Sequence, residues 1–151
     1  SILIKCAEYL KSSYEKIIEA NEKDLAKAKD NGISEGMQDR LRLNESRIDA
    51  MAEGLLEIVK LPDPVGEVME EFDRPNGLHL KKVRVPLGVI GIIFESRPNV
   101  TADAFGLTFK TGNAVILKGG KEAINSNMAI VEVLRKALSD CSVNPDVLLL
   151  I

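Results

Sequence analysis

The spacing of apolar residues along the first sixty positions predicts a run of helices. Apolar side chains recur there at the intervals of one helix face, with lysine and glutamate between them: Ile2, Leu3, Cys6, Leu10, Ile17 and Ile18. Asn21 predicts the N-cap of a second short helix, and Asn31-Gly32 predicts its end, because glycine accepts the left-handed conformation of a C-cap. Ser34 and Asn44 predict the starts of two further helices.

A different pattern begins at the breaker that contains Pro62 and Pro64, because proline cannot continue a helix. Alternating apolar and polar positions lie on both sides of Pro75-Asn76-Gly77 and predict a two-stranded hairpin. A phase slip at Lys81-Lys82 predicts a β-bulge. An isolated hairpin is marginal in water. We therefore expect this arm to lie on something else, and a partner subunit is a reasonable candidate.

From Leu87 onward, short apolar runs alternate with amphipathic segments. "LGVIGIIF" and "NAVILK" are typical of strands covered on both faces, and "DVLLLI" opens a third strand. The segments between them, "NVTADAFGLTFKTG" and "KEAINSNMAIVEVLRKALSD", have helical spacing. Strand-helix-strand-helix-strand with short connections predicts an α/β fold with a parallel, doubly wound, Rossmann-like sheet.

Composition narrows the class of protein. The chain has 151 residues, a charged fraction of 28% and a net charge of -3, which argues against a nucleic-acid binder. No apolar run approaches the roughly 18 residues of a membrane span, and no metal-ligand cluster is evident. Two distant cysteines favour a reducing compartment, so we expect a cytoplasmic protein. The chain starts without Met and ends in "VLLLI", so we expect the front part of a longer protein.

The first candidate for chemistry is "LKGGKEA", because ligands of open α/β sheets bind beyond the carboxyl ends of the strands. Gly119 and Gly120 allow close approach of backbone to a ligand, and Lys118 can donate to a sugar hydroxyl or a phosphate. Lys121 opens a helix, where a bound anion would offset its charge. Glu122 follows it, so the kinase-type phosphate loop fails, and Gly-x-Gly-x-x-Gly is also absent. A plain tight turn with two solvated lysines remains an alternative.

The second candidate is "FESRPN", after the first strand of this region. Arg97 precedes a proline and is therefore extended, and its planar fork of donors suits a phosphate or a carboxylate. Asn99 can stabilise an oxyanion, and Ser96 is a neighbouring candidate. The alternative is structural: Asn99 or Thr101 caps the helix, and Arg97 pairs with Glu95.

The other reactive side chains carry weaker signals. Cys6 lies on an apolar helix face, so we expect it in the core. Cys141 follows a helix end with no histidine near it in sequence that would activate a thiol. The single histidine, His79, falls on the polar side of the hairpin, and we expect it to be solvated.

Two stretches carry a resemblance to a known family. "KVRVPLGVIGIIFESRPNVTADA" and "KTGNAVILKGGKEAINSN" closely resemble the γ-glutamyl phosphate reductases, also called glutamate-5-semialdehyde dehydrogenases, of the aldehyde dehydrogenase superfamily. "EANEKDLAKAKDNGISEGMQDRLRLNESRIDAMAEGL" and "LPDPVGEV" extend the resemblance to nearly the whole chain. It implies NADPH-dependent reduction of L-glutamyl 5-phosphate to L-glutamate 5-semialdehyde with release of phosphate, the second step of proline biosynthesis.

The resemblance also implies how the chain is divided. Residues 1–61 would be the N-terminal helices of the cofactor domain and residues 62–86 a β-hairpin arm used in homo-oligomerisation. Residues 87–151 would be the first half of a doubly wound, parallel NADP-binding sheet. The family's catalytic domain and its nucleophilic cysteine are expected beyond Ile151. We therefore expect no catalytic residue here, and a 151-residue chain that is inactive alone.

Site residues follow from the same resemblance. In the superfamily a lysine at the position of Lys118 contacts the adenosine ribose, beside Gly119 and Gly120. NAD-preferring members often carry a glutamate where this chain has Lys121, and a lysine there favours the 2′-phosphate of NADP(H). The oxyanion asparagine of the superfamily aligns with Arg97, whereas Asn99 would require a two-residue shift, so that role stays open. Arg97 is expected to bind an anionic group of glutamyl phosphate.

Two alternatives remain open beside this function. One is a related acylating aldehyde dehydrogenase with another substrate. The other is a non-catalytic assembly or binding domain that keeps the fold for its arm. In the family mechanism, the cysteine displaces phosphate to form a thioester, which NADPH then reduces.

Overall fold

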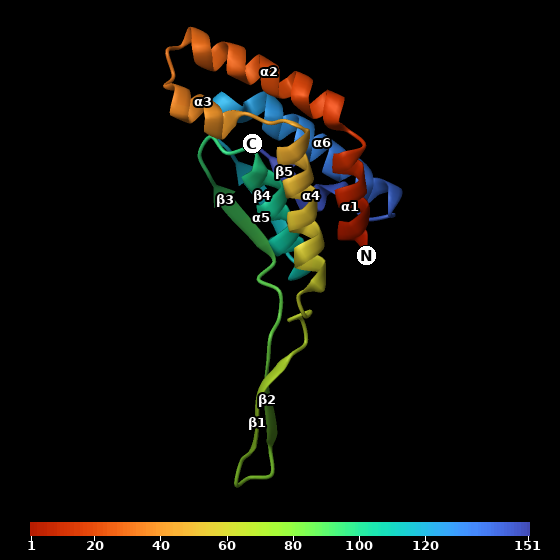
Figure 1. Cartoon of the computed structure of the whole chain (residues 1–151). Helices are drawn as coiled ribbons and strands as arrows, with labels where there is room; N and C mark the ends of the chain where they lie inside the picture. The colour runs from red at the N-terminus through yellow and green to blue at the C-terminus, as the bar shows by residue number, and fades with distance from the viewer.

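The computed structural model describes residues 1–151 as a body of helices and sheet with a hairpin that projects from it (Figure 1). The helices of the first part are α1 (Ile2–Lys11), α2 (Tyr14–Asp30), α3 (Glu35–Leu41) and α4 (Glu45–Lys60). The hairpin contains β1 (Val68–Asp73) and β2 (His79–Val83). The remainder contains β3 (Val89–Ile93), α5 (Asn99–Lys110), β4 (Ala114–Lys118), η1 (Lys121–Ala123), α6 (Ile124–Asp140), η2 (Pro145–Val147) and β5 (Leu148–Leu150). No helix is both long and apolar enough to cross a membrane.

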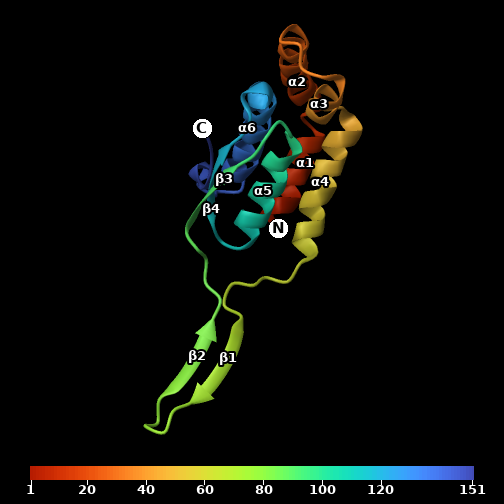
Figure 2. The same ribbon diagram turned by 90° about the vertical axis from the view of Figure 1, so that its left-hand side faces the viewer.

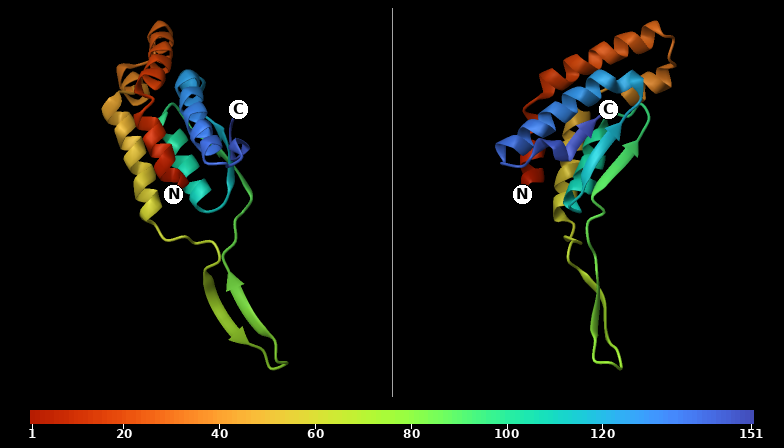
Figure 3. Two further views of the ribbon diagram at one scale, coloured as in Figure 1. Left: turned by 90° about the vertical axis from the view of Figure 1, so that its right-hand side faces the viewer. Right: turned by 180° about the vertical axis from the view of Figure 1, so that it is seen from behind.

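The sheet confirms the α/β prediction. Its three strands are parallel in the order β3-β4-β5, with Gly91 paired to Ile116 and Ile116 to Leu149. Because successive right-handed crossovers run in one direction, α5 and α6 lie on the same face of the sheet (Figure 3). The opposite face is open, and Val89 and Ile93 are 67% and 82% exposed there. The apolar run of β3 is therefore covered on one face only.

The core lies between that covered face and the N-terminal helices. Fully buried side chains from α1, α4, α5, α6 and β4 fill it, including Leu10, Leu55, Phe105, Leu117 and Leu134. α5 packs tightly on α4 at Gly106, because a Cβ atom there would lie 2.6 Å from Leu55 Cδ2. The helices α1, α2 and α4 thus share one core with the sheet, whereas Leu41 of α3 packs with Ala28 and Ala123 in a separate small cluster.

The prediction that Asn21 caps a short helix is wrong, because α2 runs unbroken from Tyr14 to Asp30. Asn21 is 1% exposed, and its Nδ2 atom donates to the Leu41 carbonyl at 2.8 Å and to Ser126 Oγ at 3.0 Å. Its Oδ1 atom accepts from the Leu43 backbone N–H at 2.8 Å. These tertiary hydrogen bonds outweigh the weak helix propensity of asparagine. The break in the helical region comes earlier, at Ser12-Ser13.

Other predicted helix boundaries are confirmed. Asn44 caps α4, since its side-chain oxygen accepts from the Arg47 backbone N–H at 2.8 Å. Gly32 follows α2 with φ 68°, as a left-handed C-cap requires. Ser34 precedes α3 but makes no capping hydrogen bond with its side chain.

The hairpin forms as predicted and points away from the body (Figure 2). Gly77 has φ 85° in the turn, and the Arg74 N–H donates to the Leu78 carbonyl at 2.8 Å. The bulge lies on β1, since Val68 pairs with Val83 and Glu70 with Lys82, which leaves Met69 extra; the predicted slip within β2 is thus an insertion in its partner. His79 is exposed, and its ring contacts Asp73 and Glu71, whose carboxylates raise its pKa.

Candidate functional site

The carboxyl ends of β3 and β4 meet, so the two candidate turns lie against each other. The Phe94 N–H donates to the Lys118 carbonyl at 3.0 Å, which extends the pairing beyond the strands. Ser96 Oγ then donates to Glu122 Oε2 at 3.1 Å and joins the turn after β3 to the turn after β4. Chemistry at either turn therefore shares one edge of the sheet.

The turn between β4 and α6 is packed from within. A Cβ atom on Gly119 would lie 2.2 Å from Asn127 Nδ2 and 3.2 Å from the Phe94 ring, so no larger residue fits. A Cβ atom on Gly120 would lie 2.8 Å from Glu122 Oε2 and 3.1 Å from Ser96 Oγ. Neither glycine has a positive φ. Internal contacts thus account for both glycines without any ligand.

The N-terminus of α6 is closed by a side chain from α2. Asp24 is 1% exposed, and its carboxylate accepts from the Ser126 backbone N–H at 2.8 Å and from Ser126 Oγ at 2.7 Å. It also accepts from Asn125 Nδ2 at 2.6 Å and from the Asn125 backbone N–H at 3.2 Å. A carboxylate already occupies the positive end of this helix. A cofactor phosphate therefore cannot use it as it does in the Gly-x-Gly-x-x-Gly folds.

Two lysines of this turn remain accessible. Lys118 and Lys121 are exposed, and neither forms a salt bridge within the chain. Lys121 lines a cavity of about 420 Å³ with Lys27 and Asn31 at the end of α2. Free ammonium groups beside a cavity fit a phosphorylated ribose better than a neutral ligand.

At the turn between β3 and α5, in contrast, no side chain caps the N-terminus of the helix. Asn99 is the first residue of α5 and makes no capping hydrogen bond, and Thr101 is buried with its Oγ1 donating to Asn127 Oδ1 at 3.1 Å. Arg97 is exposed and forms no ion pair with Glu95. Neither part of the structural alternative for "FESRPN" is therefore observed: no side chain caps the helix, and Arg97 does not pair with Glu95.

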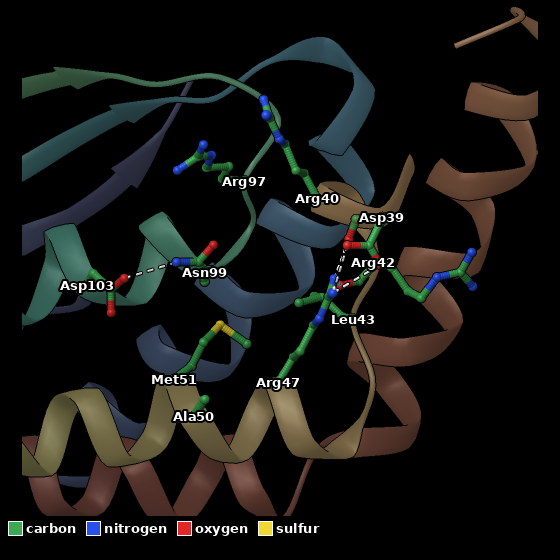
Figure 4. A pocket seen from close by; sticks show the side chains of 10 residues that line it. All are labelled: Asp39, Arg40, Arg42, Leu43, Arg47, Ala50, Met51, Arg97, Asn99 and Asp103. Atoms are coloured by element: carbon green, nitrogen blue, oxygen red, sulfur yellow. Dashed lines mark hydrogen bonds and ion pairs between the residues drawn. The ribbon is translucent and has the colours of Figure 1, made fainter. Parts of the chain in front are cut away.

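A cavity of about 350 Å³ opens beside this turn, between α5, α4 and the end of α3 (Figure 4). It is lined by Asp39, Arg40, Arg42, Leu43, Arg47, Ala50, Met51, Arg97, Asn99 and Asp103. Arg97 and Asn99 are both candidates from the sequence, and the cavity contains both of them. Ser96 lies apart from it, in a small neighbouring cavity that Arg40 and Arg97 also line.

Two further lining residues, Asp103 and Arg40, are not among the candidates predicted from the sequence. Asp103 follows Asn99 by one helical turn, and Asn99 Nδ2 donates to its carboxylate at 3.2 Å. Burial raises the pKa of Asp103, and the hydrogen bond from Asn99 opposes that shift only in part. A polar residue four positions after a candidate on a helix is a signal that could have found it. No comparable signal marks Arg40, which comes from a different helix.

The cysteines fit no role at this edge. Cys6 is fully buried, as predicted, and burial raises the pKa of its thiol to about 12, far from the thiolate form that a nucleophile needs. Cys141 caps the opposite end of α6, about 25 Å from its start for 17 residues. No group of three or more His, Cys, Asp or Glu side chains is arranged to hold a metal ion.

Comparison with known proteins places the chain. No family model matches it. It is 60% identical over 136 residues to the γ-glutamyl phosphate reductase of Carboxydothermus hydrogenoformans. This match covers 90% of this chain and 33% of that protein. It is 59% identical over 145 residues to that of Lachnospira eligens, covering 96% and 35%. The chain thus spans about a third of the length of these relatives.

Solved structures agree with the sequence relatives. The crystal structure of γ-glutamyl phosphate reductase from Thermotoga maritima matches 99% of this chain and 36% of its own, with a TM-score of 0.96 and 44% identity. A probable aldehyde dehydrogenase from Listeria monocytogenes matches with a TM-score of 0.69 at 13% identity, which shows the fold alone. The chain is therefore a homologue of the γ-glutamyl phosphate reductases, matching about a third of their length, and its α/β fold is that of the aldehyde dehydrogenases.

Proposed function

We propose that the chain is part of an enzyme that reduces L-glutamyl 5-phosphate to L-glutamate 5-semialdehyde and phosphate with NADPH, in proline biosynthesis. The observation that carries this proposal is the 60% identity to a γ-glutamyl phosphate reductase over 90% of the chain. Neither cysteine suits the nucleophile of the family mechanism. The proposal therefore assigns that role to a residue outside these 151 positions, and the chain alone is expected to be inactive.

The test is an assay of the intact protein in the reverse direction. Reduction of NADP⁺ should depend on both L-glutamate 5-semialdehyde and inorganic phosphate. A related acylating dehydrogenase with another substrate would prefer a different aldehyde or a different acyl acceptor. An intact protein that self-associates but binds no NADPH would instead be the non-catalytic assembly domain.

For the cofactor, we propose NADP(H) held at the turn after β4, where it supplies the hydride. Lys118 would contact the adenosine ribose and Lys121 its 2′-phosphate, with Gly119 and Gly120 keeping the turn narrow. Both lysines are exposed and without acidic partners, which supports this role. A glyceraldehyde-3-phosphate dehydrogenase of the same fold, from Methanocaldococcus jannaschii, is solved in complex with NADP, at 19% identity and a TM-score of 0.60.

For the substrate, we propose the turn after β3. Arg97 would bind an anionic group of the substrate, and Asn99 or Ser96 would stabilise the developing oxyanion. The cavity that contains Arg97 and Asn99 supports this assignment. Replacing Arg97 with Ala should weaken substrate binding in the intact protein, and unchanged KM and kcat would contradict it.

For assembly, we propose that the hairpin mediates a homo-oligomer. Its apolar side chains are exposed: Val68, Met69, Phe72, Leu78, Leu80 and Val83. Phe72 pairs with Leu80 across the strands, so both lie on one face. Leu80→Asp should reduce the mass of the particle measured by sedimentation, and an unchanged mass would contradict the proposal.

A further inference from the structure

The cavity in Figure 4 brings together charges of both signs that have no ionic partner. Arg97 comes from the turn after β3, Arg40 from the end of α3, and Asp103 from the second turn of α5. None of the three forms a salt bridge within the chain. A cavity of about 350 Å³ is within the range of small-molecule sites, which is roughly 300–1,000 Å³.

Asp103 is the unusual member of the set. It is half-buried, and its one hydrogen bond comes from a neutral amide, Asn99 Nδ2, at 3.2 Å. Burial raises its pKa because the loss of solvent disfavours the ionised carboxylate, and the hydrogen bond from Asn99 opposes this only in part. Gly54 of α4 gives it room, since a Cβ atom at that position would lie 3.3 Å from Asp103 Oδ1. A ligand with a positive charge would satisfy this carboxylate.

One of the four arginines that line the cavity forms an ion pair within the chain, and the other three, Arg40, Arg42 and Arg97, form none. Arg47 donates to the Arg42 carbonyl at 2.8 Å and to the Asp39 carboxylate at 3.1 Å, so it fixes the connection between α3 and α4 (Figure 4). Arg97 and Arg40 make no such bonds. The free N-terminus of α5 adds positive potential beside them. A ligand with a negative charge would satisfy this side of the cavity.

We infer that this cavity binds the α-amino-acid head group of the substrate, with Asp103 accepting hydrogen bonds from the α-ammonium and Arg97 pairing with the α-carboxylate. The inference rests on the proposed function and narrows it, because it assigns Arg97 to the carboxylate and not to the phosphate. Arg40 adds charge on the carboxylate side. Met51, Ala50 and Leu43 line an apolar wall that suits the methylene chain.

The test compares L-glutamate with glutarate as ligands of the intact protein, by calorimetric titration. The two differ in the α-ammonium alone. We expect L-glutamate to bind roughly tenfold or more tightly, as a charge-assisted hydrogen bond provides. Asp103→Asn should abolish this preference without weakening glutarate binding, because glutarate has no ammonium group for Asp103 to bind, and Arg97→Ala should weaken both ligands. Asp30→Asn, at an exposed carboxylate of α2 that does not line the cavity, is the matched control.

Equal binding of the two ligands to the wild-type protein would overturn the inference, as would a preference that survives in the Asp103→Asn variant. Circular dichroism of that variant confirms that it folds, since asparagine keeps the shape of aspartate. The ligand titration and the enzyme assay test different statements. Discrimination without turnover of the semialdehyde contradicts the proposed function alone, and turnover without discrimination contradicts the inference alone.

Discussion

The turns after β3 and β4 occupy the same edge of the sheet, yet the protein treats them in opposite ways. At the turn after β4, Asp24 occupies the positive end of α6, and Asn127 fills the space beside Gly119. At the turn after β3, the start of α5 has no capping side chain, and Arg97 and Asp103 face a cavity without ionic partners. The N-terminus of the helix after β4 is satisfied by the chain itself, although the buried Asn127 Nδ2 beside it has no hydrogen-bond partner, and the N-terminus of the helix after β3 has no capping side chain.

A glycine-rich turn is therefore weak evidence for a ligand. Gly119 and Gly120 attract attention in the sequence, but packing against Asn127, Phe94 and Ser96 explains both of them. What remains at that turn for a cofactor is the pair of exposed lysines. Unpartnered charge beside a cavity is the more informative feature, because burial of an unpaired charge is unfavourable unless something binds it.

The largest expected effect on stability comes from removing the carboxylate that caps α6 at the turn after β4. Asp24→Ala removes the acceptor of four hydrogen bonds and leaves backbone N–H groups of α6 buried without partners. The free energy of unfolding should fall by about 3 kcal/mol. Urea denaturation measures it. Asp30→Ala, an exposed carboxylate on the same helix, should change it by less than about 0.5 kcal/mol, and similar losses in both variants would contradict this account.

Gly119→Ala tests the internal explanation of the glycine. The new methyl group would overlap Asn127 Nδ2, so the free energy of unfolding should fall by about 1–3 kcal/mol even without cofactor. Gly36→Ala is the control: it lies in α3, where a Cβ atom meets nothing within 4 Å, so it should gain up to about 1 kcal/mol. Normal stability of the Gly119→Ala variant would contradict the internal explanation and would leave close approach of the cofactor as the reason for the glycine.

Lys121→Glu tests what is left for the cofactor at the turn after β4. A glutamate repels a 2′-phosphate and accepts a hydrogen bond from a 2′-hydroxyl, so the preference of the intact protein for NADP over NAD should fall roughly tenfold or more. The ratio of kcat/KM for the two cofactors measures it. Lys136→Glu, also an exposed lysine but on α6, should leave the ratio unchanged. If the ratio does not move in the first variant, Lys121 does not recognise the phosphate.

The smallest effect concerns the stability of the turn after β3. Burial raises the pKa of Asp103 in the folded protein above its value in the unfolded chain, which is about 3.9. At pH values between these two pKa values, the folded protein binds more protons than the unfolded chain. Stability is therefore lost as the pH rises through that window. Asp103→Asn removes this loss, and it should raise the free energy of unfolding more at pH 7 than at pH 3. An equal change at both pH values would contradict the assignment.

Features that depend on neighbours in the chain could be predicted from the sequence. The Asn44 cap, the turn at Gly77 and the strand-helix alternation all rest on residues within a few positions of one another. Asn21 could not be predicted, because one of its partners, Ser126, is 105 residues away. The same is true of the cavity, since Arg40 and Asp103 come together only when α3 packs near α5.

We propose that the two turns have different ligands, with the cofactor bound at the turn after β4 and the substrate at the turn after β3. Steady-state kinetics of the intact protein, with Lys121→Glu and Arg97→Ala measured side by side, tests it directly. We predict that the first variant raises KM for NADP⁺ and not for the aldehyde, and that the second raises KM for the aldehyde and not for NADP⁺. Two variants that raise the same KM, or that leave both unchanged, would contradict this proposal.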